Sequence, residues 1–384
     1  MRSAVVRRAR AGARTTCAGV LALAALLAGC SSGAEKPKPT PLAQPAPAAV
    51  RVETAWTQRI GAVRLPLRVA VAGETVAVAA SDGSVALLEA ASGRALWRAQ
   101  VDGGIAAGVG SDGRWVAVVT PGNELVVLEQ GKALWRQRVD ARVVTAPLVA
   151  GERVFVYGAD RSVHAYDAQT GGKLWTQRRP GDPLTLSQPG VLLAVRNTLV
   201  VGQGPRLAGL DPLRGNVRWE VAVASPRGTN EVERLADLVG PAARQGDTVC
   251  VRAFQSALGC IDALRGALLW SKTSRGSVGL AADEQRVYGV DATDRVTAYR
   301  SSDGDVAWEA EQFRFRGLTA PQALGGRVVV GDAEGYVHVL SAEDGTPLAR
   351  LATDGSAVVA TPVAAGGLVI VVTASGSVHA VRMP

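Results

Sequence analysis

The 384-residue chain has few of the residue types and motifs on which catalysis depends. It has three histidines, and it lacks a glycine-rich phosphate loop, an HExxH motif, a GxSxG nucleophile motif and a ladder of clustered acids. His164, His338 and His379 occur at one point of a repeated segment, where other copies have Ala86 or Thr297. Such exchange is typical of a tolerant structural position. We therefore expect no catalytic residue, no metal site and no cofactor.

The sequence also lacks an apolar run long enough to cross a bilayer as a helix. The run Cys17–Ala28 is shorter than the roughly 20 residues that a span needs, and it follows Met1–Arg14, which holds five arginines and no acid. That pattern predicts a secretory signal peptide over residues 1–29. Leu27-Ala28-Gly29-Cys30 closes it and resembles a bacterial lipobox, which predicts lipidation of Cys30. The alternative is an ordinary signal peptide with a chance cysteine.

Positive charge is scarce once the signal peptide is removed. The five arginines within residues 1–29 account for five of the net +8, which leaves +3. Because we find no basic stripe with interleaved aromatics, we expect no nucleic-acid partner.

Residues 30–50 are rich in Pro, Ala and Ser and predict an extended spacer. Ser31 beside the cysteine resembles the sorting pattern of outer-membrane lipoproteins in Gram-negative bacteria, so we expect an anchor at the periplasmic face of the outer membrane.

A convincing helical period is missing from Arg51 onward. Short Val-, Ala- and Leu-rich runs alternate instead with Gly, Asp and Ser turns, which indicates an all-β domain. An internal repeat combines an apolar strand, a turn with Gly and a Trp, at spacings of 38 to 51 residues that match one four-stranded blade. The repeat positions are Trp97, Trp135, Trp175, Trp219, Trp270, Trp308 and the degenerate Ala349, with an isolated Trp56 ahead of them.

These features predict an eight-bladed β-propeller over residues 51–384, with four antiparallel strands in each blade. Radial sheets diverge outward, so small residues suit the inner strands and a Trp on the outermost strand fills the wedge at the rim. The turn Gly relieves the steric cost of a positive φ angle. Trp56 supplies the outer strand of a blade whose inner strands lie within residues 361–381. Pairing of the N- and C-terminal strands would then close the ring and leave no long open edge.

Two cysteines lie in a predicted strand–turn–strand segment. With the turn centred near Gln255, Cys250 and Cys260 would stand opposite each other, close enough for a disulfide in an oxidising periplasm. The alternative is a pair of buried small residues, because Cys260 occupies the repeat position of Ala165.

The Gly-Trp repeat resembles that of pyrroloquinoline-quinone (PQQ) dehydrogenases, but those enzymes are longer and carry a pair of adjacent cysteines, which this chain lacks. The chain is more similar to the BamB family of outer-membrane lipoproteins, over essentially its whole mature length. The similarity lies in the lipobox, the Pro-rich spacer and the terminal GSVHAV, and in PLTLSQP (183–189), PRGTNEVERLADL (226–238) and RGLTAPQALGGRVVVGDAEGYVHVL (316–340).

The resemblance implies a non-catalytic scaffold that docks on the periplasmic domains of BamA, works with the other Bam subunits and aids the folding of outer-membrane protein clients. The partner-binding residues it implies are Leu184, Leu186, Arg234 and Asp237. Two positions depart from the family pattern, since Ser187 replaces an arginine and Val239 replaces a second acid. The alternatives are a ligand-binding or cell-wall-binding propeller and a quinoprotein dehydrogenase.

The repeat spacing supports the same two segments without the resemblance. Each follows the outermost strand of one predicted blade and precedes the innermost strand of the next, in consecutive blades, so we expect both on one face, side by side. The spacings of 44 and 51 residues make these two connections the long ones. Surplus loop length on a rigid scaffold is where binding tends to occur. The alternative is that Leu184 and Leu186 simply begin the core of the next blade.

Overall fold

A computed structural model describes residues 37–43, 50–64, 67–179, 184–226 and 229–383. The predicted signal peptide and Cys30 lie outside the described residues. The chain divides into two units, Met1–Lys38 and Pro39–Pro384, and every strand belongs to the second. Its regular elements are strands that form four-stranded antiparallel sheets, which confirms the all-β prediction. No helix among these residues has the length and apolar character needed to cross a bilayer.

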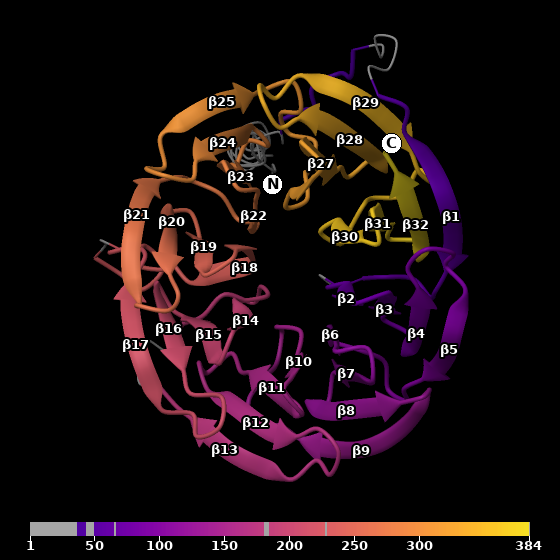
Figure 1. The fold of residues 1–384 in the computed structure, drawn as a ribbon, viewed down its shortest axis with the longest axis vertical. Coiled ribbons are helices and arrows are strands. Elements are labelled where there is room, and N and C mark those ends of the chain that lie inside the picture. The colour runs from indigo at the N-terminus through magenta and orange to yellow at the C-terminus, as the bar shows by residue number, and fades with distance from the viewer. Residues whose placement is uncertain (1–36, 44–49, 65–66, 180–183, 227–228, 384) are drawn as a thin grey trace, which may run out of the picture. The chain divides into compact units, whose positions relative to one another are not determined.

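The sheets are the blades of a ring that follow one another in chain order (Figure 1). The innermost strand is the shortest of its blade in six blades, but β18 of the fifth blade has 8 residues. In the first four blades the strands, from the axis outward, are β2 (Ala70–Ala72), β3 (Thr75–Ala79), β4 (Ser84–Glu89), β5 (Ala95–Gln100); β6 (Ala107–Ser111), β7 (Trp115–Val119), β8 (Glu124–Glu129), β9 (Lys132–Arg138); β10 (Leu148–Ala150), β11 (Arg153–Tyr157), β12 (Val163–Asp167), β13 (Lys173–Gln177); and β14 (Leu192–Val195), β15 (Thr198–Gln203), β16 (Arg206–Leu210), β17 (Val217–Ala222).

The remaining four blades complete the ring and confirm the predicted eight-bladed propeller. Their strands, in the same order, are β18 (Leu238–Gln245), β19 (Thr248–Ala253), β20 (Ala257–Asp262), β21 (Ala267–Thr273); β22 (Leu280–Ala282), β23 (Arg286–Val290), β24 (Val296–Arg300), β25 (Val306–Ala310); β26 (Gln322–Leu324), β27 (Arg327–Gly331), β28 (Tyr336–Ser341), β29 (Pro347–Ala352); and β30 (Val363–Ala365), β31 (Leu368–Val372), β32 (Ser377–Arg382), β1 (Glu53–Arg59).

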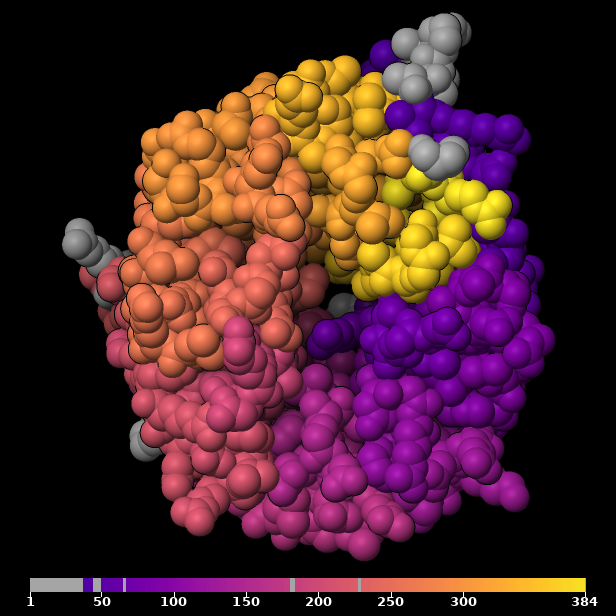
Figure 2. Space-filling view, viewed as in Figure 1, coloured from indigo at the N-terminus to yellow at the C-terminus, as the bar shows by residue number. Residues whose placement is uncertain are grey.

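The ring closes within the eighth blade, where the first strand of the chain pairs with the last. Strand β1 runs antiparallel to β32, with Trp56 opposite Ala380. In Figure 1 the indigo β1 lies along the yellow β32, and in Figure 2 the indigo and yellow atoms form one continuous part of the ring. The predicted closure by the terminal strands is confirmed. It gives the eighth blade its fourth strand.

The rim is held by a contact between the Trp of each outermost strand that has one and the turn glycine of the next blade. The indole N–H of Trp135 donates to the Ala168 carbonyl at 2.8 Å, and a Cβ added to Gly171 would lie 2.6 Å from the Trp135 ring. The turn glycine is therefore required twice, by its φ of +72° and by the ring against it. The pairs are Trp56–Gly93, Trp97–Gly131, Trp135–Gly171, Trp175–Gly215, Trp219–Gly266, Trp270–Gly304 and Trp308–Gly345.

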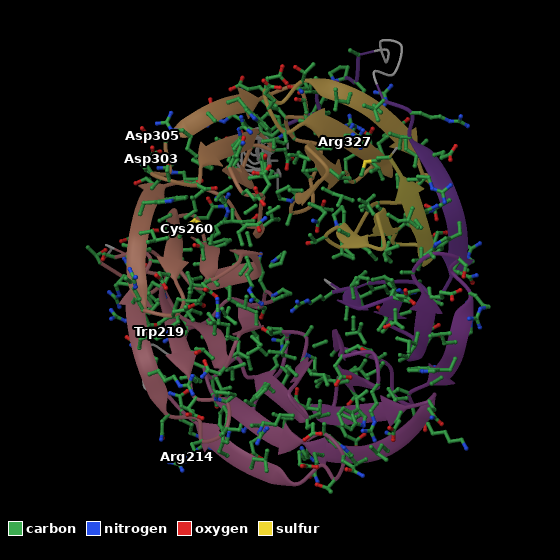
Figure 3. All side chains as sticks on the ribbon, in the orientation of Figure 1. Arg214, Trp219, Cys260, Asp303, Asp305 and Arg327 are labelled. Carbon is green, nitrogen blue, oxygen red and sulfur yellow. A yellow bond between two sulfur atoms is a disulfide. The ribbon has the colours of Figure 1, made fainter. Side chains whose placement is uncertain are left out.

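In the sequence each turn Gly stands in one repeat with the Trp of its own blade, and the structure shows its close contact with the Trp of the preceding blade. Trp219, labelled in Figure 3, lies at the rim and packs on Gly266 of the fifth blade. The same geometry explains Ala349. Its junction leads to the eighth blade, whose two outer strands are chain ends with no turn between them, so no turn glycine is there to receive a Trp. An aliphatic cluster that includes Leu348, Leu351 and Met383 fills the space instead.

The three histidines lie on the third strand of three different blades, as the repeat predicted. His164 is opposite Val156, His338 opposite Val330 and His379 opposite Val371. Burial lowers the pKa of each imidazole. The three side chains are therefore neutral residues of the sheet interior at neutral pH.

Cys250 and Cys260 are opposite each other across β19 and β20, in the register that the sequence predicted. Their sulfur atoms are bonded at 1.89 Å, and both cysteines pack with Trp270. Cys260 lies between the axis and the rim of the fifth blade (Figure 3). Oxidation of this pair in the mature protein stays a prediction.

Candidate docking surface

The two long connections lie on the same face of the ring, as expected. Residues 178–191 join β13 to β14, and residues 223–237 join β17 to β18. The other connections of this kind are shorter, from 101–106 and 274–279 up to 311–321. We call the face that carries these connections the loop face, and we call the described residues 184–190 and 229–237 the docking loops.

Asp237 joins the two docking loops. Its carboxylate accepts the Leu186 backbone N–H at 2.8 Å and the Arg161 guanidinium at 3.4 Å. The same guanidinium nitrogen lies 3.4 Å from the Leu184 carbonyl oxygen. Hydrogen bonds to a charged group are stronger than those between neutral groups. The Asp237 carboxylate, whose side chain is 16% exposed, therefore fixes the backbone of the first docking loop. The sequence identified Asp237 as a partner-binding residue, and the structure gives it an internal role in addition.

A short bridge next to Asp237 brings the two backbones into contact. Gly190 and Val239 form an antiparallel bridge, and the Gly240 N–H donates to the Pro189 carbonyl at 2.9 Å. A Cβ at Gly240 would lie 2.6 Å from the Gly190 carbonyl oxygen, so only glycine permits this approach. Val239 is 2% exposed. The position where the family has its second acid therefore presents no charged side chain here.

The loops rest on the half-buried ring of Tyr157. A Cβ at Gly190 would lie 2.9 Å from that ring. Burial, and then the charge of Asp237, raise the pKa of Tyr157 far above its usual range, so the phenol is neutral. The support beneath the docking loops is thus a rigid aromatic side chain.

The leucines of the first loop are surface residues. Leu184 is 37% exposed and Leu186 is half-buried, and neither joins a hydrophobic cluster of the neighbouring blades. Strand β14 begins only at Leu192. The alternative that these leucines start the core of the fourth blade does not hold.

The second loop adds an apolar residue that the sequence reasoning missed. Val232 is 72% exposed. The Glu233 carboxylate accepts the Thr229 N–H at 2.8 Å, and the Asn230 side chain accepts the Glu233 N–H at 2.9 Å. These reciprocal bonds form one tight turn that leaves Val232 in solvent, much as a capping box does. The Thr–Asn–x–x–Glu spacing was the available signal.

A groove of about 310 Å³ runs between the two loops. Arg179 and Arg206, on its wall, both pair with Glu220. Arg234 is half-buried and makes no ion pair with any described residue, so its charge is available to a partner. The lining residues are Arg161, Arg179, Leu184, Gln203, Pro205, Arg206, Pro226, Glu231, Arg234, Leu235, Ala236 and Asp237.

A second cation stands beside Ser187. The exposed Arg142, from the connection between the second and third blades, donates to the Ser187 hydroxyl at 3.3 Å. Nothing in the local sequence indicated this, because the two residues are 45 positions apart. The loop face therefore carries a positive charge close to the position where the resemblance implies an arginine.

These features define a class, the closed eight-bladed propellers of PQQ-like repeats that carry braced, unusually long loops on one face. The family model described as "Outer membrane protein assembly factor BamB" matches residues 81–310 and 314–382. The relative of that name in Bordetella pertussis is 36% identical over 93% of this chain and 94% of its own length, and the one in Burkholderia pseudomallei is 36% identical over 88% and 90%. The chain belongs to the BamB family.

Solved structures share the fold. The crystal structure of BamB from Moraxella catarrhalis matches with a TM-score of 0.78 at 22% identity, over 86% of this chain and all of that one. A quinohemoprotein alcohol dehydrogenase from Comamonas testosteroni matches with a TM-score of 0.65 at 16% identity, over 87% of this chain and 77% of that one. At these identities the two structural matches support the propeller fold alone.

Proposed function

We propose that this protein is a non-catalytic lipoprotein of the outer-membrane protein assembly complex that docks through its loop face on the periplasmic domains of BamA. The observation that carries the proposal is the pair of docking loops joined by Asp237, with Leu184 and Val232 exposed. Membership of a family named for outer-membrane protein assembly supports it. Cys30 carries the lipid, and at least two acyl chains are needed for a stable anchor.

The geometry suits a docking role because the loops are ordered before a partner arrives. Ordering a loop on binding costs free energy, and here Asp237 and the bridge at Gly190 have already fixed the backbone. Leu184 and Val232 supply apolar contact. Arg234 and Arg142 steer an acidic partner surface, which raises the association rate and the specificity more than the affinity. The ring holds its partners in place while client barrels fold and insert.

The absence of catalysis belongs to the proposal. The quinoprotein neighbour shares 16% identity with this chain, and a likeness at that level supports a common fold alone. The chain also lacks adjacent cysteines such as those enzymes carry.

A pull-down from gently solubilised membranes tests the docking role. The full-length tagged protein should recover the barrel-inserting subunit, and Leu184→Ser together with Leu186→Ser should lose it without moving the melting temperature. Leu213→Ser is the matched control, because Leu213 is 60% exposed on a turn at the opposite face of the fourth blade. Full recovery by the double variant would overturn the assignment of the surface. Absence of every assembly subunit, from intact membrane-bound protein, would overturn the function.

A further inference from the structure

Part of the predicted spacer lies against the propeller. In Pro39–Ala43, Thr40 and Leu42 are half-buried while Pro39, Pro41 and Ala43 are exposed, which is the alternation of an extended strand on a surface. Leu42 packs on the hydrophobic cluster of the sixth and seventh blades, which includes Phe313. We call residues 39–43 the strap. The free part of the predicted 30–50 spacer is correspondingly shorter than its composition indicated.

The strap needs few hydrogen bonds, and the propeller supplies them. Pro39 and Pro41 have no N–H to satisfy, and their fixed φ angles keep the segment extended before it docks. The Thr40 N–H donates to the Arg314 carbonyl at 2.9 Å. The Thr40 carbonyl accepts from Arg316 at 3.0 Å, and the Ala43 carbonyl accepts from Arg350 at 3.3 Å.

The receiving site is built by the propeller itself. Arg316 is 3% exposed, and its guanidinium binds the fully buried Asp332 at 2.9 Å and also Glu334. Asp332 in turn contacts the His338 imidazole at 2.9 Å. A buried guanidinium that has two carboxylate partners still has N–H groups that need an acceptor, and the Thr40 carbonyl provides it.

The backbone of the receiving loop is also fixed from the sixth blade. Asp294 accepts the Gly317 N–H at 2.7 Å and the Leu318 N–H at 2.9 Å. These bonds hold residues 314–316, whose carbonyl and guanidinium groups bind the strap. Because residues 311–321 join β25 to β26, an outermost strand to the next innermost one, the strap site lies on the loop face.

We infer that the strap is the point at which the membrane tether leaves the propeller, and that it keeps the loop face turned toward the membrane. The nine residues from Cys30 to Pro39 span at most about 30 Å, whereas a tether that was free as far as Glu53 could span about 75 Å. Docking of the strap therefore more than halves the reach. The orientation deepens the proposed function and rests on the proposed lipid anchor at Cys30. Docking of the strap on the propeller does not depend on that anchor.

The first experiment tests the docked strap without lipid. In the chain without its predicted signal peptide (residues 1–29) and with Cys30→Ser, nitroxide labels at Ala43→Cys and Asp344→Cys report one distance, because Cys250 and Cys260 are bonded to each other. We expect one narrow distance distribution, unchanged by the control Leu213→Ser, because Leu213 is 60% exposed on a turn of the fourth blade and lies outside the strap and its site. Thr40→Pro removes the donor and Leu42→Ser removes the packing, so both should broaden it. Neither change alters the propeller. A broad distribution in the parent, or a narrow one in all variants, would overturn docking.

The second experiment tests the orientation, with the lipidated protein in vesicles that contain an acceptor dye. A donor dye at Gln255→Cys, on a loop-face turn, should transfer energy more strongly than one at Glu284→Cys, on a turn of the opposite face. Thr40→Pro and Leu42→Ser should abolish the difference. Equal transfer in the parent would overturn the orientation. Failure of the parent to bind vesicles would overturn the anchor and the orientation together, and would leave the docked strap standing on the first experiment.

Discussion

At the rim, seven junctions between blades repeat one Trp–Gly contact, whereas on the loop face the connections at 178–191 and 223–237 are matched by no others in length. The rim contact recurs because every junction has the same wedge to fill. Its single exception, Ala349, falls where the ring is closed by chain ends. The docking loops recur nowhere, and they are tied by bonds between distant residues. Repetition in this molecule accompanies packing, and departure from the repeat accompanies the proposed binding.

The largest effect should come from removing a rim contact. Trp270 is 7% exposed, its indole N–H donates to the Ser301 carbonyl at 2.8 Å, and its ring packs on Gly304. Trp270→Ala should lower the free energy of unfolding by about 3–5 kcal/mol, measured with urea. The neighbouring Leu269 is 50% exposed, and Leu269→Ser should change it by no more than about 0.5 kcal/mol. Equal effects of the two variants would break the comparison.

Removal of the disulfide should lower the free energy of unfolding by a smaller amount. The bond joins β19 to β20 within the fifth blade, in addition to the Trp–Gly contacts at the rim. Cys250→Ser with Cys260→Ser should cost about 2–3 kcal/mol, because the bond closes a short loop and constrains the unfolded chain. Thiol titration of the unfolded, unreduced mature protein should find neither cysteine free. Two free thiols would contradict the bond.

Removing the brace between the loops should weaken binding and leave the fold intact. Asp237→Asn keeps an acceptor for the Leu186 N–H and loses the charge that pairs with Arg161. The cost of about 1.4 kcal/mol corresponds to about tenfold weaker binding. Titration against the purified periplasmic domains of the partner measures the affinity, and calorimetry the melting temperature. A variant that melts like Trp270→Ala would show that Asp237 belongs to the packing.

The smallest effect concerns pH. Because burial lowers the pKa of His164, His338 and His379 in the folded protein, the unfolded chain binds more protons below about pH 6.5. Stability is fully present above that pH and falls as the pH drops. Between about pH 7 and about pH 5.5 the free energy of unfolding should fall by no more than about 1 kcal/mol for each histidine. His379→Gln should reduce this fall, measured by urea unfolding at the two pH values. An unchanged pH dependence in this variant would contradict the idea that protonation of His379 contributes to it.

Most of the fold could be predicted because the repeat marks it chemically. The Gly-Trp spacing predicted the blade count, the strand order and the closure through Trp56. The strand register followed from aligning the copies, and it placed His164 and Cys260 correctly. The contact partner of each turn glycine was not predicted, because spacing along the chain does not distinguish a contact within a blade from one across a junction.

The candidate site was only partly predictable. Loop length located the two connections, but the bond between Asp237 and Leu186 joins residues 51 positions apart, with no local pattern to signal it. The same holds for Arg142 beside Ser187 and for the strap, whose Thr40 binds Arg316 across 276 positions. Composition predicted an extended segment at residues 39–43, and only the three-dimensional arrangement shows what lies beneath it.

Photo-crosslinking in cells tests the central claim, that the loop face is the docking surface, most directly. A photoreactive residue at position 232, on the second docking loop, should crosslink to the barrel-inserting subunit. The same residue at position 213, exposed on the opposite face of the ring, should not. Crosslinking from position 213 with none from position 232, in protein that is folded and membrane-bound, would contradict the account.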